Sequence, residues 1–192
     1  MLRIILASGS PRRKQLLGVL NLSFNIILPG VDESLYLPEG SPEEYCSLLA
    51  GLKADNVSRN NSESLVIGAD TIVVIDSKII GKPSDKADAV QMLKGLSGNT
   101  HTVHTAVALR MPSRHIKKTF VESTQVTFRD LSEHTINYYI DNHAPYDKAG
   151  SYGIQDFSAV FVKSLTGCYH NVMGFRNSRF HFEISKLNLA ID

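Results

Sequence analysis

Apolar runs of strand length alternate along most of this chain with stretches in which apolar residues recur at helical spacing. The runs predict strands at 4–7, 24–28, 65–67, 71–75, 79–80, 100–110, 117–129 and 158–165. This alternation is typical of an α/β domain, and the two longest runs predict an antiparallel hairpin. Because parallel and antiparallel pairings are mixed, the pattern favours a long twisted mixed β-sheet flanked by helices.

The predicted helices are marked by their capping residues. Ser10, followed by Pro11 at the first helical position, predicts a helix whose leucines face the core. Residues 41–44 form a capping box that opens a helix ending at about residue 58. Two further helices are predicted after Ser84 and over 132–143. The stretch after residue 165 is poorly patterned and predicts no element.

Composition limits the classes of function. A chain of 192 residues without an evident linker predicts a single domain over 1–192. With 20 basic and 19 acidic residues its net charge is +1, so no global field would hold nucleic acid or a membrane, and any anion site must be local. Cys46 and Cys168 lack the paired spacing of a zinc site. No signal peptide or membrane-spanning run is recognisable, so we expect a cytoplasmic protein.

The first helix start carries the groups that bind phosphate. Ser8 and Gly9 are small and let the backbone approach an anion, while the free N–H groups and the dipole of the helix favour negative charge. Arg12 and Arg13 add planar donors that match phosphate oxygens. The alternative is a surface helix with two solvated arginines.

Two acidic positions are candidates for acid–base or metal chemistry. Asp70 interrupts an apolar run beside two small residues, where it would be a metal ligand, a general base or a turn residue. Asp32 and Glu33 form an acidic cluster in the loop after the second strand, which is either a metal site or simply solvated. Hard oxygen ligands of this kind suit Mg²⁺ or Mn²⁺.

Two lysines and a glutamine complete the polar candidates. Lys53 lies at the edge of a helical apolar stripe, where the alternative is a lysine that reaches out to solvent. Lys82 is fixed between Gly81 and Pro83, a composition also common in structural turns. Gln155, in a polar glycine-rich loop, offers both a donor and an acceptor for a base edge.

The histidines do not predict a metal site. His101 and His104 are three residues apart on a predicted strand, so their side chains point to opposite faces and would not share an ion. The remaining histidines are scattered, and we expect surface or capping roles for them.

Taken together, these motifs resemble those of the Maf family of nucleoside triphosphate pyrophosphatases. The resemblance runs from residue 3 to about residue 174 and rests on motifs in register at 8–13, 31–33, 53–54, 68–71, 81–83, 96–98 and 147–155. It departs after Gly174, where Phe175-Arg176-Asn177 stands in place of the Leu-Pro usual in the family.

The resemblance implies a fold similar to the inosine triphosphate pyrophosphatases and a metal-dependent hydrolysis of a nucleoside triphosphate to the monophosphate and diphosphate. It implies that Asp70 is the proton acceptor and Glu33 a metal-site carboxylate. It assigns the remaining positions to substrate, with phosphate contacts from Arg13, Lys53 and Lys82, and base contacts from Arg12, Thr71 and Gln155.

The base-contact residues match the branch that acts on dTTP and UTP, and not the branch that prefers 7-methyl-GTP. Two alternatives stay open at this point: a pyrophosphatase for modified purine nucleotides, and a non-enzymatic regulator of cell division that binds a protein partner. The resemblance also implies a homodimer.

Overall fold

A computed structural model describes residues 2–187 and 189. The ends of the single domain expected over 1–192 therefore lie outside the described residues. Within them the chain forms two compact units, one from the described residues of 1–70, 105–122 and 174–192, the other from 71–104 and 123–173.

Seven strands form a mixed sheet with the order β2-β1-β3-β5-β6-β7, and β4 pairs with β3. This confirms the predicted fold class. Strands β3 (Leu65–Ile75), β5 (Thr100–Met111) and β6 (Ile116–Phe128) contribute residues to both units. Because β5 and β6 are neighbours joined by only a short connection, they form the predicted antiparallel hairpin.

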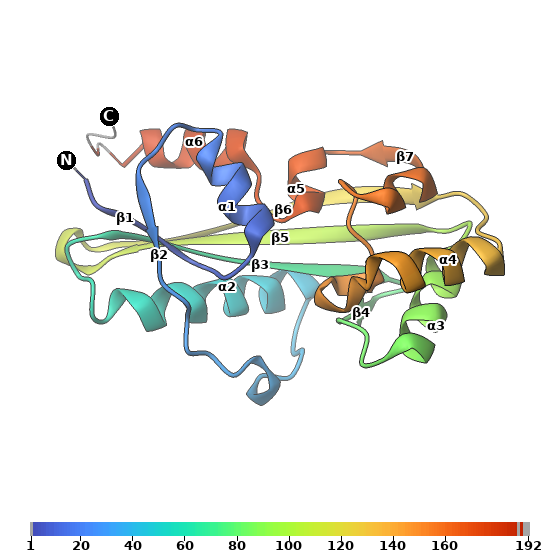
Figure 1. The fold of residues 1–192 in the computed structure, drawn as a ribbon. Helices are drawn as coiled ribbons and strands as arrows, with labels where there is room; N and C mark the ends of the chain where they lie inside the picture. The colour runs from blue at the N-terminus through green and yellow to red at the C-terminus, as the bar shows by residue number, and fades with distance from the viewer. Residues whose placement is uncertain (1, 188, 190–192) are drawn as a thin grey trace. The chain divides into compact units, whose positions relative to one another are not determined.

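The first unit builds the parallel part of the sheet. Strand β1 (Ile4–Ala7) pairs in parallel with β2 (Phe24–Ile26) and with β3. In this unit, helices α1 (Pro11–Gly18) and α6 (Asn177–Ser185) cover one face of the strands and α2 (Pro42–Ser58) covers the other (Figure 1). The predicted caps of α1 and α2 are confirmed: Ser10 accepts from the backbone N–H of Arg13, and the capping box between Ser41 and Glu44 is complete.

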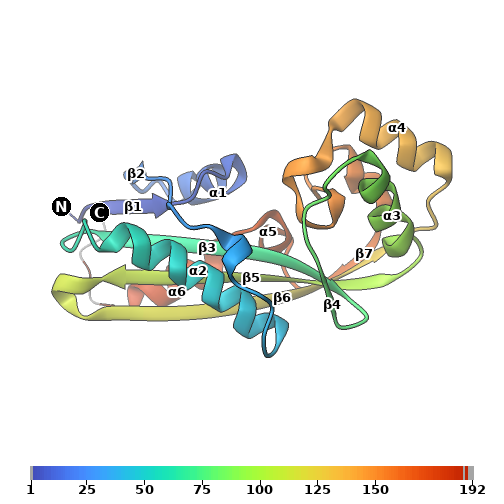
Figure 2. The ribbon, with the colours of Figure 1, turned by 90° about the horizontal axis from the view of Figure 1, so that it is seen from below.

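The second unit builds the antiparallel part. Strand β4 (Lys78–Ile80) pairs with β3 and β7 (Val162–Thr166) pairs with β6, both antiparallel. Helices α3 (Lys86–Leu96) and α4 (Glu133–His143) lie side by side in this unit (Figure 2). The remaining elements are short: α5 (Tyr169–Met173) and the 3-10 turns η3 (Pro145–Asp147), η4 (Ala149–Ser151) and η5 (Phe157–Phe161). Tyr139, Phe128 and Phe161 form much of its aromatic core.

Three predicted elements were wrong in detail. The strand expected over 158–165 begins as η5, and only its second half is β7, because Asp156 caps a 3-10 turn through the N–H of Ser158. The helix expected after Ser84 is capped by Asp85, which accepts from the N–H of Asp88. Residues 68–70 do not separate two strands, since β3 is continuous from Leu65 to Ile75.

Gly68 in strand β3 permits α2 to pack closely against the strand. A Cβ at Gly68 would lie 2.4 Å from the carbonyl oxygen of Ala50 and 2.8 Å from Cβ of Ala54. The glycine that breaks the apolar pattern therefore reflects helix contact rather than a turn.

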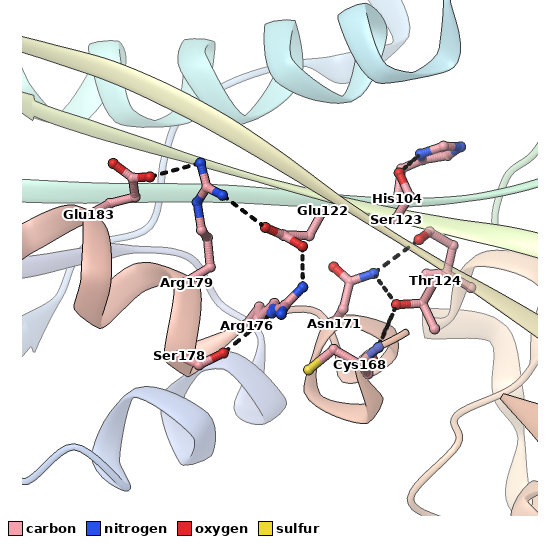
Figure 3. A network of polar contacts seen from close by, with 11 residues as sticks. His104, Glu122, Ser123, Thr124, Cys168, Asn171, Arg176, Ser178, Arg179 and Glu183 are labelled. Atoms are coloured by element: carbon pink, nitrogen blue, oxygen red, sulfur yellow. Dashed lines mark hydrogen bonds and ion pairs between the residues drawn. The ribbon is translucent and has the colours of Figure 1, made fainter. Parts of the chain in front are cut away.

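The unpatterned C-terminal stretch contains two helices, α5 and α6. In the first unit, α6 is fixed to β6 by ion pairs: Arg176 and Arg179 both reach Glu122, and Arg179 Nη2 also lies 2.8 Å from Oε1 of the buried Glu183 (Figure 3). In the second unit, the side chain of Asn171 and the backbone N–H of Cys168 both donate to the hydroxyl of Thr124. The contacts of Glu122 and Thr124 join residues about fifty positions apart, which is why local periodicity does not reveal them.

Candidate active site

The first unit brings a lysine and two carboxylates together from three different elements. Lys53, on α2, has its Nζ 2.5 Å from Oδ1 of Asp70 on β3 and 2.8 Å from Oε1 of Glu33. Glu33 opens the 3-10 turn η1 (Glu33–Leu35), which Asp32 caps. Lys53 and Asp70 are each only 7% exposed, whereas the side chain of Glu33 is 45% exposed. The lysine thus bridges a buried and a solvent-facing carboxylate.

This geometry excludes two of the alternatives left open by the sequence. Asp70 lies within a continuous strand and is not a turn residue. Lys53 is buried between two carboxylates and does not reach out to solvent. A buried charge is retained only when it is paired. The cluster of Lys53, Asp70 and Glu33 is therefore a candidate active site.

The start of α1 supplies the cationic part. The Nε of Arg13 donates to the carbonyl oxygen of Gly174 at 3.0 Å, and its Nη1 donates to Oγ of Ser8 at 3.3 Å. The same Ser8 oxygen accepts from the N–H of Ser10 at 3.2 Å. Arg13 is half-buried and bonded, so the alternative of a solvated arginine does not hold for it. Arg12 beside it is also half-buried.

Electrostatics link Arg13 to the carboxylates. Burial lowers the pKa of the Arg13 guanidinium, and the negative charges of Asp70 and, to a smaller extent, Glu33 oppose that shift. An arginine stays protonated at any accessible pH, so it remains a cation here. The candidate site in the first unit therefore includes the cations of Arg13 and Lys53 and the carboxylates of Asp70 and Glu33.

Two further side chains of α2 lie near the cluster of Lys53, Asp70 and Glu33, and the sequence alone did not identify them as part of a site. The Sγ of Cys46 donates to the backbone carbonyl of Asp70 at 3.5 Å, and burial together with Asp70 raises the pKa of this thiol to about 12. Cys46 is therefore a protonated packing group and not a nucleophile. The hydroxyl of Tyr45 donates to the carbonyl of Tyr36 at 3.1 Å. Their only signal in the sequence is that they follow the capping box on the helix that carries Lys53.

The other candidate residues lie in the second unit. Thr71 follows Asp70 along β3 and is half-buried, while Lys82 and Gln155 are exposed on loops. The loop of Lys82 is joined to the loop that precedes Gln155, because the N–H of Gly150 donates to the carbonyl of Gly81 at 2.9 Å. Within this unit the structure thus connects the two loops, although it shows no direct contact between Lys82 and Gln155.

Glu33 and Asp70 supply hard oxygen ligands of the kind that a divalent cation prefers. Oxygens of Glu33 and Asp70 lie 2.8 and 2.5 Å from the Nζ of Lys53, so the two carboxylates are close together and the lysine ammonium occupies the point that they share. Among the described residues, no group of three or more His, Cys, Asp or Glu side chains could hold a metal by itself. Mg²⁺ is commonly bound by one or two carboxylates together with substrate phosphates. Two converging carboxylates are consistent with that mode.

The two strand histidines have structural partners in the second unit. His101 Nε2 lies 2.7 Å from the hydroxyl of Tyr152, and its ring packs edge-on against Phe128. His104 Nδ1 lies 2.8 Å from Oγ of Ser123. Because Nδ1 of His101 is buried with no hydrogen-bond partner, a proton on it would be unsolvated. His101 is therefore a neutral core residue.

This burial makes the stability of the protein depend on pH. Burial lowers the pKa of His101 from its ordinary value of 6.5 to about 4, so between these values the unfolded chain binds a proton that the folded chain does not. Stability is then lost as pH falls through this window, by about 2–3 kcal/mol between pH 7.5 and 4.5. Urea unfolding across that range, compared with His101→Gln, measures the effect. An equally steep loss in the variant would show that His101 is not responsible.

Comparisons with known proteins identify the family to which this chain is similar. A family model described as Maf-like protein matches residues 3–186. Two curated relatives named dTTP/UTP pyrophosphatase, from Bacillus anthracis and Bacillus cereus, are each 46% identical over 191 residues, which cover 100% of this chain and 98% of theirs. A solved HAM1 protein from Coxiella burnetii has a TM-score of 0.54 at 14% identity, covering 97% of this chain and 100% of its own, and is similar in fold alone. No helix in the described part of the chain combines the length and apolarity needed to cross a membrane.

Proposed function

This chain belongs to the Maf-like protein family, and from that membership we propose that it hydrolyses dTTP and UTP to the nucleoside monophosphate and diphosphate. The observation that carries the proposal is the buried Lys53 held between Asp70 and Glu33, in a unit that also presents Arg13 at a capped helix start. The substrates are those in the names of relatives that align over the whole chain.

In the proposed reaction a water oxygen forms a bond to the α-phosphorus and the bond from that phosphorus to the α,β-bridging oxygen breaks. Asp70 accepts the proton of the attacking water, and diphosphate leaves with the electron pair of the broken bond. A general base must be held within hydrogen-bond reach of the proton that it accepts. Lys53 restrains the Asp70 carboxylate, because its Nζ donates to Oδ1 at 2.5 Å.

Charge at the transferring phosphate is offset by cations of this chain. Arg13 is pre-oriented by its bonds to Gly174 and Ser8, so a phosphate meets a donor that is already in place. Lys53 adds a second cation in this unit. The proposed phosphate contact of Lys82, on an exposed loop of the second unit, rests on the family resemblance alone. The N–H groups at the start of α1 favour the same anion.

We further propose that Glu33 and Asp70 hold a divalent cation, Mg²⁺ or Mn²⁺, when substrate is bound. Such an ion supplies charge neutralisation and Lewis-acid polarisation at the phosphates. The support for this site is the convergence of the two carboxylates, one of which, Glu33, is open to solvent.

Base selection is proposed for Arg12, Thr71 and Gln155. Gln155 is exposed and carries both an amide donor and a carbonyl acceptor, which suits the edge of a pyrimidine. Arg12 and Thr71 are half-buried polar side chains in their respective units.

Diphosphate release from dTTP, UTP, CTP, 7-methyl-GTP, ITP and dATP, with Mg²⁺ or Mn²⁺, tests the proposal. We expect dTTP and UTP to be preferred, and Gln155→Ala to reduce that preference by about tenfold, since an unpaired base edge costs about 1–3 kcal/mol. A preference for ITP or 7-methyl-GTP would favour the purine alternative. No release from any nucleotide would overturn the enzymatic proposal and favour the regulatory one.

A cytoplasmic location and a homodimer remain proposals that rest on the family resemblance. Sedimentation of the purified chain distinguishes the dimer from the monomer. Fractionation of cells that express it tests the location.

A further inference from the structure

The segment that carries Glu33 is poorly buried. Residues 27–41 connect β2 to α2, and within them Leu28, Leu35 and Leu37 are each about 70% exposed or more. Glu33 itself is exposed. Apolar packing therefore does little to hold this segment, and the position of the Glu33 carboxylate must depend on polar contacts.

Two side chains of α2 supply contacts at the ends of a short loop, residues 30–36, here called the Glu33 loop. At one end, Oδ1 of Asn56 accepts from the N–H of Gly30 at 3.1 Å. At the other end, the hydroxyl of Tyr45 donates to the carbonyl of Tyr36 at 3.1 Å. Within the loop, the N–H of Tyr36 donates to the carbonyl of Glu33 at 3.1 Å. A contact that fixes Tyr36 therefore also restrains the backbone of Glu33.

The spacing of the two contacts matches the length of the loop. Residues 45 and 56 are 11 positions apart, which is about three turns and about 16 Å of helix, so both side chains lie on one face of α2. An extended residue advances the chain by about 3.4 Å and a 3-10 residue by about 2 Å. With three steps of each kind between residues 30 and 36, the Glu33 loop also spans about 16 Å. The loop therefore runs alongside the helix, antiparallel to it, with Glu33 near its middle and opposite Lys53.

From this arrangement we infer that Tyr45 and Asn56 are positioning residues that hold the Glu33 loop along α2, so that the Glu33 carboxylate meets Lys53 and Asp70. The inference rests on the proposed function, because it requires that Glu33 takes part in the proposed reaction. The hydroxyl of Tyr45 stays a donor at neutral pH, since burial and the charges of Asp70 and Glu33 raise its pKa.

Removing either contact should loosen the loop and slow the reaction without unfolding the protein. We expect Tyr45→Phe and Asn56→Ala each to lower kcat/KM for dTTP about fivefold and to speed amide exchange in residues 30–36 by a similar factor, as the loss of one hydrogen bond implies. Asn56→Asp keeps the acceptor oxygen and should retain activity. Tyr138→Phe, at a half-exposed tyrosine of α4, is the matched control and should change neither quantity.

A double-mutant cycle with Glu33→Gln separates positioning from general stability. If Tyr45 acts through Glu33, Tyr45→Phe should cause no further loss of activity in the Glu33→Gln background. An equal fivefold loss in both backgrounds, or unchanged exchange in residues 30–36, would overturn the inference. Failure of the proposed function is distinguishable, because then the unmodified chain releases no diphosphate while the exchange measurement still reports on the loop.

Discussion

Asp70→Asn should lower the turnover of dTTP and UTP by about 10²–10⁴, the usual contribution of a general base. The amide has almost the same shape as the carboxylate, and its oxygen still accepts from Lys53, so the fold should persist. Lys53 also keeps its ion pair with Glu33. Diphosphate release and thermal unfolding, measured on the same preparation, check both parts of this expectation.

Asp76→Asn is the matched control for this change. Asp76 is exposed in a turn with a φ of 48°, a conformation that asparagine adopts readily, so activity should be unchanged. Normal turnover in Asp70→Asn would mean that another group takes the proton, and Asp70 would then be left with a structural or metal-binding role.

Lys53→Met should reduce kcat/KM by about 10²–10³, the typical cost of removing one preorganised charged donor. Methionine fills similar space but leaves Asp70 as a buried carboxylate without its 2.5 Å partner. We also expect the free energy of unfolding to fall by about 2–3 kcal/mol, less than for a fully buried pair because Glu33 is half-exposed. Activity should be assayed well below the unfolding midpoint, which separates the two effects.

The comparison variant is Lys94→Met. Lys94 pairs with Glu133 on an exposed surface of the second unit, and such pairs contribute little. Its activity and stability should remain near those of the unmodified chain. If Lys53→Met behaved like Lys94→Met, the bridging lysine would have no role in the reaction.

The parts of the fold that were predicted correctly depend on local signals. Ser10 and Pro11 define the start of α1 through neighbouring atoms alone, and the capping box at Ser41 does the same for α2. Phosphate-binding chemistry at the start of α1 was inferred from this local order. A cap and a fixed φ leave a clear pattern in the residues next to them.

Some features of the fold and the site were not predicted because they depend on residues far apart in the sequence. Lys53 appeared to lie at the edge of an apolar stripe, and only the fold shows that Asp70, 17 positions later, buries it. Helix α6 was not predicted, and the contact of Arg176 at its start with Glu122 on β6, more than 50 positions earlier, is not visible in the local sequence. A search for local periodicity does not detect ion pairs of this kind.

The close approach of α2 to β3 at Gly68 has a consequence for the timing of catalysis. Gly68 and Asp70 share one face of β3, and Ala54, which Gly68 contacts, is the neighbour of Lys53. The close packing of α2 on β3 therefore helps to bring Lys53 and Asp70 together, in addition to the attraction of their charges. Such a pair is assembled when the protein folds, so the arriving nucleotide does not have to organise it, and high salt should leave its geometry intact.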